Sequence, residues 1–203
     1  SPRVLAYHYP GLWNCCGINS HGLALMWTSA GLFPPVPPRV GVPTYAVTAE
    51  ILRLKSVTAA LEFLDRVRYA GSFMLFLGDA AGNMAVVEAM PGYRVVDRSD
   101  AALYRANYFM CPGMIRRSRQ NEPQLGVDHD ALRMQGMRRQ IAEYRGRISV
   151  PMVKTMLSHP DVFSDNGTRM ATLDRFVAVC RDRALWACRG AKPDNGPWWK
   201  IEV

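Results

Sequence analysis

Two mostly apolar runs near the start of the chain are separated by four small or polar residues. The runs cover 13–18 and 23–27, and the residues between them are Asn19-Ser20-His21-Gly22. Glycine readily adopts the positive φ that a tight turn requires, and asparagine tolerates the same region. The pattern therefore predicts an antiparallel hairpin with at least one buried face.

Further apolar runs predict the remaining strands. Residues 72–78 and 84–90 are joined by Asp79-Ala80-Ala81-Gly82-Asn83, which predicts a second hairpin. Shorter strands at 93–97 and 103–108 would extend the sheet that contains it. Strands are also expected at 2–8, 170–179, 184–189 and 198–203.

Between these strands, apolar residues recur at the spacing of a helix. A helix is predicted over about 45–54, and Ser56 is suited to cap a second helix over 57–69. Later, an amphipathic helix is predicted over about 129–146 and a shorter one over 150–158. The proline-rich residues 33–38 are expected to form an extended surface loop, and 111–127 is predicted to be mostly irregular.

The order of these elements predicts the fold class. Strands, a helix pair, strands, helices and strands follow one another, and the connections between sequential strands are too short for βαβ crossovers. The sheets should therefore be mainly antiparallel. We predict an α+β fold in which a single domain over residues 1–203 forms a four-layer αββα sandwich of two such sheets.

Composition is typical of a folded protein. The 203 residues are 49% hydrophobic and 21% charged. No apolar run approaches the roughly 20 residues that span a bilayer, and no leader segment is visible at the start. Reduced thiols in a cytoplasmic protein are expected, because the five cysteines have no metal-type spacing. They are Cys15, Cys16, Cys111, Cys180 and Cys188.

The net charge of +8 is concentrated in the second half of the chain. Residues 101–203 contain seventeen Lys and Arg against ten Asp and Glu, whereas residues 1–100 contain eight against seven. Such an excess could form a solvated basic surface, or attract nucleic acid, a membrane surface or an anionic substrate. Because aromatic residues are not interleaved with the arginines, we expect no nucleic-acid partner, and we expect no membrane partner either.

General catalytic motifs are absent from the sequence. It contains no phosphate-binding glycine loop, no H-E-x-x-H and no G-x-S-x-G. Asp128-His129-Asp130 contains three candidate ligands, but adjacent residues at a helix start cannot converge on one metal ion. No metal and no cofactor are therefore expected.

A family resemblance runs through the chain. The run Gly17-Ile18-Asn19-Ser20-His21-Gly22-Leu23-Ala24-Leu25 resembles the G-x-N-x-x-G-L-A-V segment of the acyl-coenzyme A:6-aminopenicillanic acid acyltransferase family, peptidase family C45. Other landmarks follow in the family's order, so that the resemblance covers nearly all 203 residues. They are Gly41-Val42-Pro43, Ser56-Val57-Thr58-Ala59-Ala60-Leu61, Phe76-Leu77-Gly78-Asp79-Ala80-Ala81-Gly82, Val86-Val87-Glu88, Arg105-Ala106-Asn107-Tyr108-Phe109 and Arg169-Met170-Ala171-Thr172-Leu173.

The resemblance implies both a fold and a chemistry. The family is similar in fold to the N-terminal nucleophile hydrolases, which are αββα sandwiches. Such enzymes cleave their own precursor to expose a cysteine whose α-amino group serves as the base. The thiol attacks an amide carbonyl, an acyl-enzyme forms, and water or an amine accepts the acyl group. The implied partners are a small-molecule amide or acyl substrate and an N-terminal segment or α-type chain of the same precursor. A homo-oligomer is left open.

Two site residues are implied by the resemblance. Asn107 matches the family's asparagine that helps to form the oxyanion hole, and Arg169 matches an arginine near the active site. A side-chain amide is a neutral donor, and an arginine can hold a substrate carboxylate or orient the nucleophile. The alternatives from the sequence are a turn asparagine and one more surface arginine.

The chain departs from the family pattern at several positions. The family's nucleophilic cysteine and a nearby Asn-x-Asp motif lie upstream of the strand that begins this chain, and Ser1 lies well past the nucleophile position. Cys15 and Cys16 fall inside the hairpin, where buried core thiols are expected. Met26, Thr28 and Ser29 replace asparagines often found there, and Tyr108 replaces a histidine.

Three hypotheses follow. The first is an amide hydrolase or acyltransferase whose cysteine is supplied from upstream, this chain being most of a β-type subunit without its N-terminal strands. The second is a catalytically silent scaffold of the same fold that binds a small acylated or anionic ligand. The third, a basic nucleic-acid-binding module, rests on net charge alone.

Overall fold

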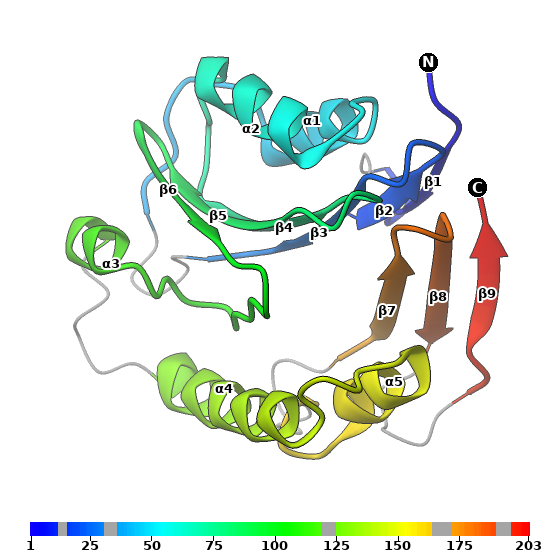
Figure 1. Cartoon of the computed structure of the whole chain (residues 1–203). Coiled ribbons are helices and arrows are strands. Elements are labelled where there is room, and N and C mark those ends of the chain that lie inside the picture. The colour runs from blue at the N-terminus through cyan, green and yellow to red at the C-terminus, as the bar shows by residue number, and fades with distance from the viewer. Residues whose placement is uncertain (12–15, 31–35, 119–124, 164–171, 190–195) are drawn as a thin grey trace.

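Strands of the larger sheet follow one another in space as they do in the sequence. The computed structural model describes residues 1–11, 16–30, 36–118, 125–163, 172–189 and 196–203, with only the backbone of 125–129. Within these residues, six antiparallel strands lie in the order β1 to β6 (Figure 1). They are β1 (Val4–Tyr7), β2 (Cys16–Asn19), β3 (Ala24–Thr28), β4 (Phe73–Gly78), β5 (Met84–Met90) and β6 (Tyr93–Arg98).

The C-terminal strands form a separate antiparallel sheet. It contains β7 (Asp174–Val179), β8 (Ala184–Arg189) and β9 (Trp199–Glu202), in that order. Ile18 and Ala24 of the larger sheet pack against Leu185 of the smaller one. This apolar cluster joins the two sheets beside the first hairpin.

Helices cover the outer side of each sheet (Figure 1). On the larger sheet lie α1 (Thr44–Ile51) and α2 (Val57–Arg66), and α3 (Pro112–Ser118) follows β6. On the far side of the molecule lie α4 (Leu125–Glu143) and α5 (Val150–Ser158). The predicted α+β fold of four layers, αββα with two antiparallel sheets, is confirmed.

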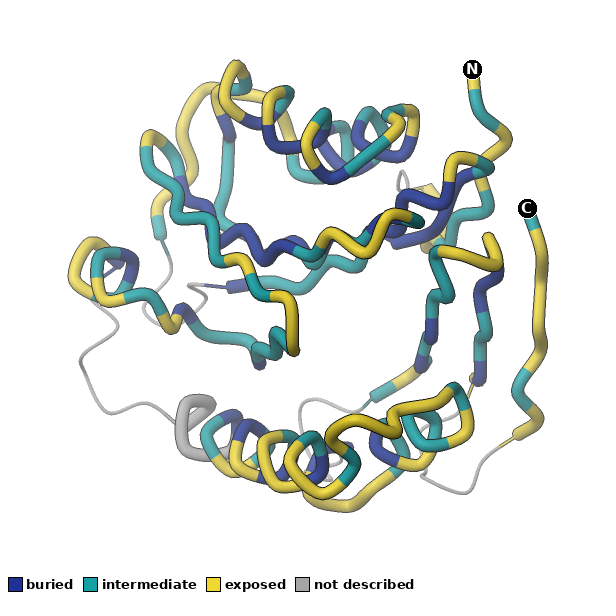
Figure 2. The backbone as a smooth tube through the Cα atoms, in the orientation of Figure 1, coloured by how far each residue is buried: buried dark blue, intermediate teal, exposed yellow. Residues whose placement is uncertain are grey.

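Successive side chains of a strand point to opposite faces of the sheet, which explains why helices α1 and α2 pack on one face of the larger sheet. Phe73, Leu75 and Leu77 of β4 are buried in one cluster with side chains of α1 and α2, whereas Met74 faces a second cluster with Phe109 of the chain after β6. Figure 2 shows the buried inner sides of α1 and α2 against this sheet and their exposed outer sides. Most of the apolar core therefore lies between the sheet and these two helices.

The first hairpin forms where the pattern predicts it, with a different role for Asn19. Gly22 has a φ of 81°, as the turn requires. Asn19 is not among the described residues with positive φ. It ends β2 fully buried, and its Oδ1 accepts hydrogen bonds from the backbone N–H groups of His21 and Leu23. Its Nδ2 donates to carbonyl groups at the end of α1, which ties the hairpin to that helix.

Asp79 organises the second hairpin and the start of α2. Its Oδ1 accepts from the backbone N–H groups of Ala81 and Asn83, and its Oδ2 accepts from Val57 N at 3.0 Å. Burial opposes ionisation of Asp79, but these hydrogen bonds outweigh it and hold its pKa below the usual value. The predicted N-cap is confirmed, since Ser56 Oγ accepts from Ala59 N at 3.2 Å.

Several sequence-based boundaries were wrong. No strand forms over 103–108, because the chain there is held by side-chain bonds to β5 described below. Part of the segment expected to be irregular is helix α3, which Pro112 can begin because a first-turn N–H needs no helical partner. Helix α4 begins at Leu125 rather than at 129, and α2 ends at Arg66 because Val67 is extended.

Candidate active site

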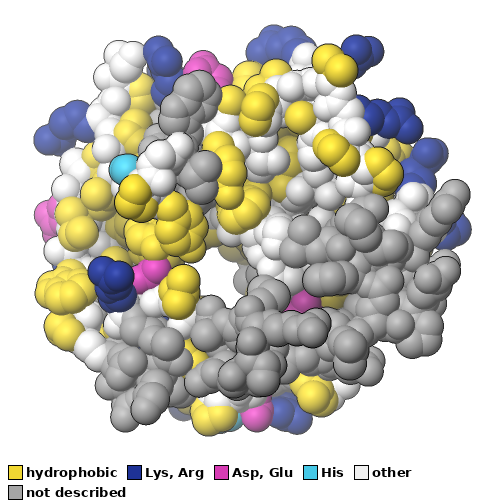
Figure 3. Space-filling view, turned by 180° about the vertical axis from the view of Figure 1, so that it is seen from behind, with side chains coloured by type: hydrophobic (Ala, Val, Ile, Leu, Met, Phe, Trp, Pro, Cys, Tyr) yellow, Lys and Arg dark blue, Asp and Glu magenta, His cyan; other side chains and the backbone are white. Residues whose placement is uncertain are grey.

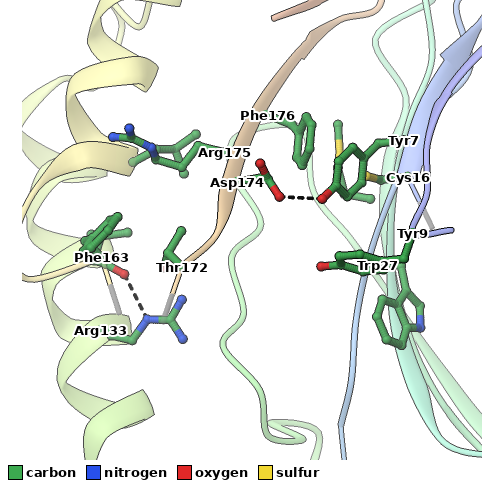
Figure 4. Close-up of a pocket in the computed structure, with 13 residues that line it drawn as sticks. Tyr7, Tyr9, Cys16, Trp27, Arg133, Phe163, Thr172, Asp174, Arg175 and Phe176 are labelled. Carbon is green, nitrogen blue, oxygen red and sulfur yellow. Dashed lines mark hydrogen bonds between the residues drawn. The ribbon is translucent and has the colours of Figure 1, made fainter. Parts of the chain in front are cut away.

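A cleft of about 350 Å³ lies between the two sheets and the α4–α5 layer (Figure 4). On the side of the larger sheet it is lined by Tyr7, Tyr9, Cys16, Met26 and Trp27. On the other side it is lined by Arg133, Leu157, Val162, Phe163, Thr172, Asp174, Arg175 and Phe176. Figure 3, from behind, shows a hollow near the middle of the molecule with hydrophobic side chains gathered along one side. The cleft is thus mainly apolar, with a few charged groups.

Tyr7 links the two sheets across one end of the cleft. Its hydroxyl donates to Asp174 Oδ2, and its ring lies 4.8 Å from that of Phe176 on β7 (Figure 4). Burial and the neighbouring Asp174 carboxylate raise the pKa of Tyr7 well above that of a free phenol. Tyr7 is therefore a protonated donor that holds β1 to β7.

Arg133 brings a positive charge from α4 into the cleft. Its Nε donates to the carbonyl oxygen of Val162 at 2.9 Å, and its Nη1 donates to Asp130 Oδ1 at 3.0 Å. The guanidinium points into the open space toward the larger sheet (Figure 4). An arginine held at two points in this way can carry its charge at a fixed position.

Asn107, in the segment after β6, lies next to Arg133 and contacts Thr28 at the end of β3. Its Oδ1 accepts from Arg133 Nη1 at 3.2 Å, and its Nδ2 donates to Thr28 Oγ1 at 2.7 Å. Longer contacts of 3.4 Å join Nδ2 to the carbonyl and hydroxyl oxygens of Ser29. Among the described residues, one N–H of the amide is thus well bonded to Thr28, and the other has the weaker contacts to Ser29, which an incoming oxygen could replace.

Of the two site residues that the family resemblance implies, one lies within the described structure. Asn107 is placed beside the cleft through Arg133, whereas Arg169 lies outside the described residues. Thr172, three positions after Arg169, lines the cleft. Two of the departures from the family pattern are also at the site, since Met26 lines the cleft and Thr28 holds the Asn107 amide.

A buried ion pair supports the segment that carries Asn107. Glu88 on β5 is 0% exposed, and its carboxylate accepts from Arg105 Nε at 2.8 Å. It also accepts from the backbone N–H groups of Met110 and Cys111. Arg105 donates further to Asp97 at 2.6 Å. Burial alone would lower the pKa of Arg105, but the two carboxylates outweigh it and raise that pKa.

Glu88 and Arg133 contact the Asn107 segment, and reasoning from the sequence did not identify either of them as part of the site. Glu88 could have been recognised from the sequence, because it is a charged residue in the otherwise apolar run 84–90. Buried carboxylates need partners, and Arg105 lies in the motif that contains Asn107. Nothing in the sequence distinguishes Arg133, since it is one of many arginines and its partner Asn107 is 26 positions away.

The cysteines resemble core thiols more than nucleophiles. Cys15 lies outside the described residues, and Cys16 is 8% exposed at the wall of the cleft. Burial raises the pKa of Cys111 and of Cys180 above the usual thiol value. Thiols that are protonated at neutral pH are poor nucleophiles. Among the described cysteines, no pair is joined by a disulfide.

The layers and the cleft define the class of the molecule. Two antiparallel sheets between helix layers are the αββα sandwich of the N-terminal nucleophile hydrolase fold. Penicillin V acylase from Agrobacterium tumefaciens has this arrangement, with a TM-score of 0.72 and 14% identity over 100% of this chain and 70% of that one. Two variants of conjugated bile acid hydrolase from Clostridium perfringens give TM-scores of 0.69 and 0.71 at 12% and 13% identity. They cover 97% and 98% of this chain and 75% of the relative.

The family is established by sequence. The pattern that defines the acyl-coenzyme A:6-aminopenicillanic acid acyl-transferase family matches residues 5–192, so the chain belongs to this family. No curated protein sequence matches the chain significantly. In the part of the chain that the structure describes, none of the helices combines the length and the apolar character needed to cross a bilayer.

Proposed function

We propose that the protein is an amide (C–N) hydrolase or acyltransferase that works through an acyl-enzyme on a cysteine supplied by a segment upstream of this chain. The observation that supports the proposal is the position of Asn107, which matches the asparagine of the family's oxyanion hole. It lies one hydrogen bond from the arginine that enters the cleft between the sheets. Membership of the acyltransferase family supports the same chemistry.

The reaction begins with attack of the cysteine sulfur on the amide carbonyl carbon. The thiol proton passes to the α-amino group, whose ordinary pKa of about 8 suits a base near neutral pH. The carbonyl oxygen becomes an oxyanion, and in this proposal the weakly bonded N–H of Asn107 stabilises it. The C–N bond then breaks, the amine leaves with the proton, and a thioester remains. Water or a second amine releases the acyl group and restores the thiol.

The cleft favours a small amide with an apolar acyl part. Trp27, Phe163 and Phe176 form apolar parts of its walls, and Arg133 supplies a positive charge beside them. The names of the structural relatives give penicillin V and conjugated bile acids as what those proteins act on. We extend that substrate class, a small-molecule amide, to this chain.

The upstream partner is part of the proposal. The chain matches 70% to 75% of the length of its structural relatives, so each relative contains residues beyond the matched part. We propose that residues 1–203 form one domain, most of a β-type subunit, released from a precursor by autoproteolytic processing. Its partner would be the N-terminal segment or α-type chain of that precursor. The cytoplasmic location stays a prediction from composition.

A silent scaffold is the second candidate, and a specific observation favours it. Thr28, which replaces an asparagine of the family, takes the best hydrogen bond of the Asn107 amide. A site with a hydroxyl where the family often has a side-chain amide would hold a small acylated or anionic molecule without turning it over.

One experiment separates the two candidates. The protein is produced from its whole gene, its processed N-terminus is determined by mass spectrometry, and it is treated with an electrophile that mimics an acyl group. We expect stoichiometric labelling of an N-terminal cysteine and release of amine from a small aromatic amide. Replacing that cysteine by alanine should abolish both. A processed protein that binds the amide, takes no label and releases no amine would establish the scaffold.

A further inference from the structure

A line of hydrogen bonds crosses the molecule from α4 to β3 through Asn107. Asp130 Oδ1 accepts from Arg133 Nη1 at 3.0 Å, and the same Nη1 donates to Asn107 Oδ1 at 3.2 Å. Asn107 Nδ2 in turn donates to Thr28 Oγ1 at 2.7 Å. These side chains belong to α4, to the segment after β6 and to β3. Their meeting is therefore a product of the tertiary fold.

The arginine decides which end of the amide faces the strand. The two ends of a carboxamide have nearly the same size and shape, so hydrogen-bond partners alone fix its orientation. A guanidinium contains only donors, and only the oxygen of Asn107 can face it favourably. The NH₂ group must then turn toward Thr28. Rotation of the amide by half a turn would place donor against donor beside a fixed positive charge.

Arg133 is itself held in place. Three hydrogen bonds join it to Val162, Asp130 and Asn107, and its side chain is 25% exposed. Arg139 on the same helix provides a contrast, since its side chain is 66% exposed and its ion pair is with Asp161 at the surface. Surface pairs of this kind contribute little, whereas Arg133 is more buried and its Nη1 bonds to Asn107 as well as to Asp130.

We infer that Arg133 is the positioning residue of this site and that Asp130 anchors it. The inference rests on the proposed function, in which Asn107 stabilises the oxyanion. A cation on the oxygen side of the amide draws electron density from its nitrogen and strengthens the N–H groups as donors. Arg133 thus sets both the direction and the strength of the donor that the substrate oxygen meets.

The first test observes the amide without reference to activity. In the processed full-length protein labelled with ¹⁵N, the NH₂ cross-peaks of Asn107 are assigned by their loss in Asn107→Ser. We expect these cross-peaks to shift in Arg133→Met and to shift less in Arg133→Lys, which keeps a donor. They should stay in place in Arg139→Met, the matched control on the same helix. Cross-peaks that remain in place in Arg133→Met would overturn the inference.

The second test separates an effect on the chemical step, seen in kcat, from an effect on substrate binding, seen in KM. We expect Arg133→Met to lower kcat about 10- to 100-fold, as a misplaced group does, with KM within about twofold of the parent. Arg133→Lys should recover part of the loss, and thermal unfolding reports whether each variant is folded. A rise in KM alone would overturn the inference and make Arg133 a substrate contact.

The two proposals fail in different ways. A parent enzyme that releases no amine refutes the proposed function, while shifted Asn107 cross-peaks in Arg133→Met would still support the orienting role. A fully active parent whose kcat is unchanged in Arg133→Met refutes the positioning role and leaves the proposed function standing. If Arg133→Met does not fold, Arg133→Lys decides the matter by the same two measurements.

Discussion

Asn19 in the first hairpin and Asn107 beside the cleft both belong to motifs of the family, yet their surroundings differ. The amide of Asn19 is fully buried, and its partners among the described residues are backbone groups of its own turn and of the segment just after α1. Asn107 is partly exposed and bonds chiefly to the side chains of Thr28 and Arg133, with a weakly bonded N–H left over. Backbone partners fix local geometry, whereas exchangeable partners beside a cleft suit chemistry. Asn19 is therefore structural and Asn107 is the candidate catalytic residue.

The strongest test of this contrast is Asn107→Ala. We expect kcat to fall about 100- to 1000-fold, the usual cost of one oxyanion donor, with little change in the melting temperature. Amine release from the processed enzyme and thermal unfolding measure the two effects. An equal loss of kcat in folded Asn19→Ala would contradict the division of roles.

Glu88→Gln tests whether the support of Asn107 is structural. The change leaves the buried Arg105 with Asp97 as its one remaining carboxylate and gives two backbone N–H groups a weaker acceptor. We expect a loss of about 3 kcal/mol in the free energy of unfolding, measured with urea. Glu62→Gln on the exposed side of α2 is the control. If Glu88→Gln lowers the free energy of unfolding no more than Glu62→Gln does, Glu88 does not support this segment.

Asn19→Ala should act on stability alone. Removal of its side chain leaves two carbonyl and two N–H groups without this partner inside the protein. We expect the free energy of unfolding to fall by about 2 kcal/mol, with kcat retained while the protein is folded. Ser20→Ala, which removes one exposed hydrogen bond, is the matched control and should change little. Loss of kcat with unchanged stability would reverse our view of Asn19.

The smallest expected effect is on the pH dependence of stability, through Asp79, which like Asn19 has a structural role. Its pKa is lowered in the folded protein, so its contribution to stability is present above the pKa of the unfolded state. That contribution is lost as the pH falls through the lowered pKa. Urea unfolding over a series of acidic pH values should therefore show a steeper decline for the parent than for Asp79→Asn. Asp100→Asn, at an exposed site, should follow the parent curve.

Local patterns in the sequence were sufficient for most of the fold. The apolar runs on either side of Gly22 and of 79–83 predicted both hairpins, and Ser56 predicted the start of α2, because these features depend on neighbours in the chain. The strand expected over 103–108 was wrong for the opposite reason. That segment is fixed by Glu88, a partner 17 to 23 positions away that no local pattern contains.

The candidate site was only partly predictable for the same physical reason. Family motifs indicated Asn107 but gave no information on what holds it, since Thr28 and Arg133 approach from 79 and 26 positions away. Arg133 follows Asp130 by three positions, a spacing that any surface helix can show. The role of such a residue emerges only when the layers of the fold bring α4 toward β3.

The Tyr7–Asp174 bond has a consequence for the width of the cleft. It joins the edge strand of the larger sheet to β7, so the two sheets cannot move apart at this end without breaking it. An ordinary tyrosine would lose this donor as the pH rises past about 10. Because burial and Asp174 raise the pKa of Tyr7, its hydroxyl keeps the proton, and with it the bond to Asp174, to a higher pH than an ordinary tyrosine would. The hydrogen bond that holds the two sheets together at this end of the cleft is therefore less sensitive to alkali than one made by an ordinary tyrosine.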